Sequence, residues 1–143
     1  MLDGLFVTPA VTAIEEALQS ARATGAIAVV GHAKLAAALA KTHEVVPVAM
    51  PKRAKLAGAV ADLSAVEPGS LAAVIGIDIA IDDSWESTLR AWSRVVRDGG
   101  AVVLVERGRS PEASRRALCA GLAEIEQRRA GRVVVTSGLV TQL

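Results

Sequence analysis

Short apolar runs alternate along the chain with segments whose apolar residues recur every three or four positions. The runs at 26–30 and 71–77 are continuous and of strand length, which is typical of strands buried on both faces of a sheet. Weaker runs predict further strands at 44–48, 59–62 and 101–105. Because helical patterns separate these runs, the sequence predicts a doubly wound α/β fold with a mainly parallel sheet and helices on both faces.

Start and stop signals predict the first two helices. A hydroxyl residue followed by proline, at Thr8 and Pro9, indicates the start of the first helix, and Gly25 indicates its end. A second helix is expected over 34–41. The strand expected after it contains Pro47, which cannot donate a ladder hydrogen bond, and this argues against a central place in the sheet.

The third helix has the most regular pattern. Asp83 and Glu86 have the spacing of a capping box, and one face of the helix is apolar, formed by Trp85, Leu89, Trp92 and Val96. A last helix is expected from Ser110-Pro111 to about Arg129, since acidic residues precede basic ones toward its end. Two short strands, 132–137 and 139–142, then follow around Gly138.

Composition narrows the classes of protein. The 143 residues are 52% hydrophobic and 22% charged, which predicts one folded domain over 1–143. The formal net charge of +1 gives no general attraction to nucleic acid or to an acidic membrane surface. No apolar run approaches the roughly 18–20 residues that span a bilayer, so no membrane association is expected.

Cysteine usage and the first residues of the chain predict a cytoplasmic location. Cys119 is the single cysteine, which excludes an internal disulfide and a cysteine-cluster metal site, and we expect it to be buried within the last helix. The two histidines lack the spacing of a metal site, so no metal is expected. The first residues do not have the pattern of a secretory signal.

In a doubly wound sheet, ligands bind beyond the carboxyl ends of the strands. The ends with chemical interest are Gly31, followed by His32, and the acids Asp62 and Asp78. His32 is the best-placed candidate for a general base, although a loop histidine is more often structural. The side chains of His32 and Lys34 would crowd a cofactor that approaches the backbone after the first strand.

Two segments resemble class I S-adenosylmethionine-dependent methyltransferases. Glu67-Pro-Gly-Ser-Leu-Ala-Ala-Val74 is similar to the family's segment entering its fourth strand. Residues 82–105, with two tryptophans and the turn Asp98-Gly-Gly100, are similar to its fourth helix, glycine turn and fifth strand. The resemblance covers residues 9–108 and implies a Rossmann-like domain with a crevice for S-adenosylmethionine.

The resemblance also shows where the cofactor motifs are missing. Gly31 stands alone where the family has a glycine-rich motif, Ala49 replaces the ribose-binding acid, and Ala72 replaces an Asp that enters the fourth strand. Asp62 matches the acid near adenine, and Asp78 follows the fourth strand. These three retained positions, Gly31, Asp62 and Asp78, are therefore the cofactor-binding residues that the resemblance implies.

These features favour a methyltransferase-like domain that has lost catalysis, binds no cofactor and acts as a binding or regulatory subunit, with no catalytic residue assigned. Its partner would be another protein or a second copy, bound through the final strands or the outer face of the last helix. One alternative is a minimal S-adenosylmethionine-dependent methyltransferase for a small molecule. A less favoured alternative is a nicotinamide-dinucleotide domain in which Arg53 receives a 2′-phosphate.

Overall fold

A computed structural model describes residues 2–30, 32–48, 66–77, 85–107 and 112–141. Its elements follow in the order α1 (Leu2–Ser20), β1 (Ile27–Val30), α2 (Ala33–Leu39), β2 (Val45–Val48), β3 (Leu71–Ile77), α3 (Trp85–Val95), β4 (Val96–Arg107), α4 (Glu112–Cys119), β5 (Ala123–Ala130) and β6 (Val133–Leu139). The strand expected at 59–62 and the capping residue Asp83 lie outside the described residues.

Six described strands form one mixed sheet in the order β2-β1-β3-β4-β6-β5. The strands β2, β1, β3 and β4 are parallel to one another, whereas β6 is antiparallel to both β4 and β5. This arrangement confirms the predicted α/β fold with a mainly parallel sheet. Among the described strands it also places β2, which contains Pro47, at one edge, in agreement with the missing backbone donor.

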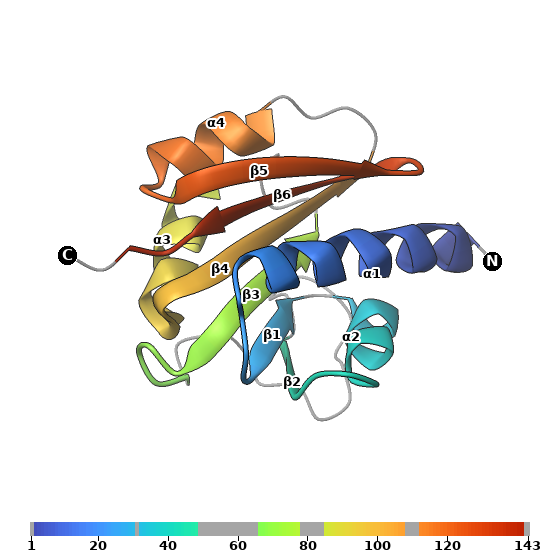
Figure 1. Ribbon diagram of the computed structural model, residues 1–143, viewed down its shortest axis with the longest axis horizontal. Helices are drawn as coiled ribbons and strands as arrows, with labels where there is room; N and C mark the ends of the chain where they lie inside the picture. Colours follow the sequence, from blue (N-terminus) through green and yellow to red (C-terminus); the bar gives the residue numbers. More distant parts are fainter. Residues whose placement is uncertain (1, 31, 49–65, 78–84, 108–111, 142–143) are drawn as a thin grey trace.

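Helices cover both faces of the sheet (Figure 1). On one face α1 and α2 pack against alternate residues of β1, β3, β4 and β6, and on the other face α3 and α4 pack against the intervening ones. All seven residues of β3 are buried. Burial on both faces is the reason that β1 and β3 are continuous apolar runs in the sequence.

The first helix differs from its prediction at both ends. α1 begins at Leu2 and continues through Pro9, which removes one backbone donor without ending the helix. It ends at Ser20 because Arg22 adopts a left-handed backbone with φ 53°, while the Ala23 amide donates to the Leu18 carbonyl over 2.9 Å. This is the geometry of a Schellman cap, so the helix ends before Gly25.

The last helix is much shorter than predicted. α4 ends at Cys119 because Gly121, with φ 91°, allows the Leu122 amide to reach the Ala117 carbonyl at 3.1 Å. The segment predicted to continue the helix to Arg129 is instead the strand β5, paired with β6. Ladder hydrogen bonds with β6 therefore override the helical charge pattern of this segment.

Two further predictions for the C-terminal part of the chain are wrong. Cys119 is exposed at the end of α4 and is not a buried core residue. Gly138 does not separate two strands, because it lies within the single strand β6. A Cβ atom there would lie 2.7 Å from Ile125 Cδ1 and 2.8 Å from Leu122 Cβ. The glycine is needed so that the chain leaving α4 can pack directly on β6.

We therefore predict that Gly138→Val lowers the free energy of unfolding by about 1–3 kcal/mol, because the added side chain overpacks this contact. Chemical denaturation monitored by circular dichroism measures the change. Ile125→Ala removes one of the two opposing groups, so the loss in the Gly138→Val/Ile125→Ala double variant should be smaller than the sum of the losses of Gly138→Val and Ile125→Ala. Strictly additive losses would show that no close contact exists between these positions.

Candidate functional site

The predicted ligand crevice lies at the carboxyl ends of the parallel strands. Val30 of β1 and Leu104 of β4 lie level with Gly76 of β3 in the strand register. β1 ends at this row and β3 ends one residue beyond it, whereas β4 continues to Arg107. The three residues proposed for cofactor binding, Gly31, Asp62 and Asp78, lie outside the described residues. The described part of this edge is therefore formed by the start of α2 and the last residues of β3 and β4.

His32 is the N-cap of α2. Its backbone is extended, with φ −142° and ψ 101°, and its Nδ1 atom accepts a hydrogen bond from the Leu35 amide over 3.0 Å. The half-buried imidazole thus satisfies one of the helix's free amide donors, as a capping Ser or Asp does elsewhere. This contact supports the structural interpretation of His32, and Lys34 in the next turn is exposed.

The helix that His32 caps is short. α2 has seven residues and no acidic residue in its first turn. Rossmann-like domains bind phosphate or carboxylate groups at this helix start, where free backbone amides converge on the ligand. In this chain the imidazole is bound to one of those amides.

The described ends of β3 and β4 include one buried acid. Ile77 is 9% exposed, and Glu106 is 1% exposed although it carries a carboxylate. Glu106 follows the alternation of Val102 and Leu104, so it faces the layer formed by α3 and α4. In the sequence, Glu106 directly follows the apolar run 101–105, but no local signal indicates its burial.

The other described histidine serves a different contact. His43 Nε2 lies 2.8 Å from Glu15 Oε1, and Thr42 Oγ1 donates to the same oxygen over 3.2 Å. His43 precedes β2, so this pair lies at the amino ends of the strands, opposite the crevice. It connects α1 to the turn after α2 and brings no nucleophile toward the crevice.

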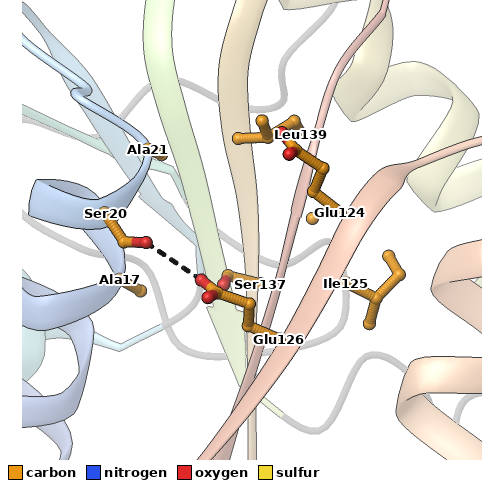
Figure 2. A pocket seen from close by; sticks show the side chains of 9 residues that line it. Ala17, Ser20, Ala21, Glu124, Ile125, Glu126, Ser137 and Leu139 are labelled. Atoms are coloured by element: carbon orange, nitrogen blue, oxygen red, sulfur yellow. Dashed lines mark hydrogen bonds between the residues drawn. The ribbon is translucent and has the colours of Figure 1, made fainter.

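A pocket lies away from the crevice, between the end of α1 and the strands β5 and β6 (Figure 2). Ser20 Oγ donates to Glu126 Oε2 over 3.0 Å across this pocket. Arg128 Nη2 also lies 3.3 Å from Glu126 Oε2, and its Nε lies 3.8 Å from Glu16. These polar groups are engaged with one another, so they attach α1 to β5.

Neither a metal centre nor a membrane span was found in the described ranges. The His, Cys, Asp and Glu residues of these ranges form no group of three or more that could hold a metal ion. The helices described include none that is long and apolar enough to cross a membrane.

The chain was compared with protein families, curated proteins and solved structures. No protein-family profile matches the chain, and no curated protein matches it. Solved structures do match. A chain of the complex between the Haloferax volcanii Trm112 methyltransferase activator and a putative methyltransferase has a TM-score of 0.67 at 12% identity, covering 90% of this chain and 89% of that one.

Two further structures are similar over comparable lengths. A putative S-adenosyl-L-methionine-dependent methyltransferase from Methanococcus maripaludis has a TM-score of 0.66 at 12% identity, covering 96% of this chain and 86% of that one. A SAM-dependent methyltransferase from Aquifex aeolicus has a TM-score of 0.62 at 10% identity, covering 94% and 90%. Together with the sheet order and the two helical layers, these matches show that the chain has a class I methyltransferase-like, Rossmann-like fold.

Proposed function

We propose that this chain is a methyltransferase-like domain that does not transfer methyl groups and acts by binding a protein partner. The observation that carries the proposal is the hydrogen bond that the His32 imidazole accepts from the Leu35 amide at the start of α2. A cofactor at this position needs close approach to the backbone, which glycines provide and a capping imidazole obstructs.

The residues around His32 support the same conclusion. Gly31 is the sole glycine between β1 and α2, and the residue after β2, Ala49, has no group to accept ribose hydroxyls. Methyl transfer depends on holding the sulfonium and the acceptor in a fixed geometry. A crevice with neither a glycine-rich turn nor a ribose acceptor gives the cofactor few positioning contacts.

A protein-binding role is supported by two kinds of observation. One match is a chain of a complex that contains a methyltransferase activator together with a putative methyltransferase, so proteins of this fold occur in such assemblies. The chain itself exposes a large apolar side chain, Leu118, on α4 beside the edge strand β5.

The second candidate function is a minimal S-adenosylmethionine-dependent methyltransferase. It is favoured by the matches from Methanococcus maripaludis and Aquifex aeolicus, which are described as enzymes that depend on this cofactor. Nothing in the comparisons supports our expectation that this chain binds no cofactor. In an active enzyme, Gly31, Asp62 and Asp78 would hold the cofactor, and His32 would have to turn away from Leu35.

The two functions predict different thermal stability with cofactor. A ligand at 100 times its Kd stabilises the native state by about 2.7 kcal/mol, which raises Tm by roughly 5–10 °C for a domain of this size. We expect no increase in Tm with millimolar S-adenosylmethionine or S-adenosylhomocysteine. A known S-adenosylmethionine-dependent enzyme is the positive control. A saturable increase in Tm with either compound would favour the enzyme and overturn the proposal.

The cap itself is tested by replacing His32. We expect His32→Ala to lower the free energy of unfolding by about 1 kcal/mol, because the Leu35 amide loses its acceptor. His32→Asn retains an acceptor at this position and should recover most of the loss. Denaturant titration measures both variants. Equal stability of the Ala and Asn variants would contradict a capping role.

A further inference from the structure

β5 is the second edge of the described sheet, and it differs from the edge strand β2. β2 has four residues and contains Pro47, features that discourage pairing with another chain. β5 has eight residues and contains no proline. In the ranges that the structure describes, no strand pairs with its outer side (Figure 1). Such an edge presents backbone donors and acceptors to a further strand.

Two opposite charges lie next to each other on one face of β5, at the centre of the strand. Glu126 and Arg128 lie on the side of α1, 3.3 Å apart, with their side chains 51% and 22% exposed. Gln127 lies between them on the opposite side, near α4, and is exposed. Ile125 lies on the α4 side as well, because it packs with the cluster on that face.

This pattern is complementary to itself when two copies of β5 run antiparallel. The two-fold axis of such a pair is perpendicular to the sheet, so opposite residues share a face. With the axis at Gln127, each Glu126 lies opposite Arg128 of the second copy. With the axis one residue earlier, Glu126 would lie opposite Glu126. With the axis one residue later, Arg128 would lie opposite Arg128. Of these three registers, the Glu126 and Arg128 charges therefore favour the one centred on Gln127.

The α4 side of the same edge carries a groove lined by Ser114, Arg115, Leu118, Ile125 and Gln127. Leu118 is 64% exposed and lines the groove together with Ile125 and Gln127. Among the described residues Leu118 is the one large hydrophobic side chain that is exposed. Because Gln127 lies at the axis of the favoured register, the grooves of two copies would face each other across it. Pairing would then bury both Leu118 side chains.

We propose that two copies of this chain associate through antiparallel pairing of β5, centred on Gln127, and that the two α4 helices cover the junction with Leu118. The pairing joins two sheets into one and places Glu126 beside Arg128 both along each strand and across the interface. This proposal deepens the proposed binding role by naming the partner as a second copy, but it stands whether or not the cofactor site is lost.

Sedimentation velocity of the full chain tests the proposal. We expect a monomer–dimer equilibrium in the micromolar to submillimolar range. Glu126→Arg should weaken the dimer roughly tenfold or more, because both cross-strand pairs become repulsive. Gln127→Lys should also weaken it by placing two ammonium groups at the axis. Glu86→Arg reverses a similarly exposed carboxylate on α3, 57% exposed, and should leave the dimer unchanged.

Mixing two variants tests the register itself. Glu126→Arg carries two cations at the paired positions and Arg128→Glu carries two carboxylates, so each variant should self-associate weakly. Their equimolar mixture places unlike charges opposite each other and should recover dimer formation. Circular dichroism checks that each variant is folded. If Arg128→Glu does not fold, the proposal is tested by comparing the dimer dissociation constants of Glu126→Arg and Gln127→Lys with that of Glu86→Arg.

A chain that stays monomeric at submillimolar concentration would overturn this inference. It would also be overturned if Glu126→Arg and Gln127→Lys had the same dimer dissociation constant as Glu86→Arg. The same holds if Glu126→Arg and Arg128→Glu both fold but their mixture stays monomeric. None of these results bears on S-adenosylmethionine binding. Conversely, cofactor binding by a dimeric chain would overturn the proposed function and leave the β5 interface intact.

Discussion

Burial of the central strands on both faces is the constraint on which this structure depends. β3 contributes seven buried residues, and its two faces belong to two separate apolar clusters. A strand in this position must be apolar throughout, and it must be covered by helices on both sides. The layers formed by α1 with α2 and by α3 with α4 follow from this requirement. The ligand crevice is predicted at the strands' carboxyl ends because doubly wound sheets bind ligands there.

The parts of the fold that depend on this burial could be predicted from the sequence. β3 and the apolar face of α3 are confirmed, because each follows from apolar periodicity. Among the described strands β2 lies at an edge, in agreement with the missing backbone donor of Pro47. The segment from Ala123 to Ala130 could not be predicted in this way. Its charges fit a helix, but pairing with β6 across the turn at Gly131 decides its conformation, and a helical charge pattern carries no information about that pairing.

The candidate site was only partly predictable for a related physical reason. The sequence indicated that His32 follows the first strand, but the orientation of its imidazole depends on the Leu35 amide and on where α2 begins. Likewise, the burial of Glu106 depends on α3 and α4 packing over β4. The fold is methyltransferase-like, and the cap at the start of α2 depends on the histidine at position 32. The proposed change of role depends on that cap.

Backbone amide spectra of the isotope-labelled protein test this central claim most directly. A cofactor in the crevice must contact the turn before α2 and disturb the hydrogen bond between His32 and Leu35. We predict that the amide resonances of Leu35 and of β1 stay unchanged when S-adenosylhomocysteine is added in large excess. Saturable shifts of the Leu35 amide resonance and of resonances at the end of β1 would show that S-adenosylhomocysteine binds beside the His32 cap, and would contradict the account.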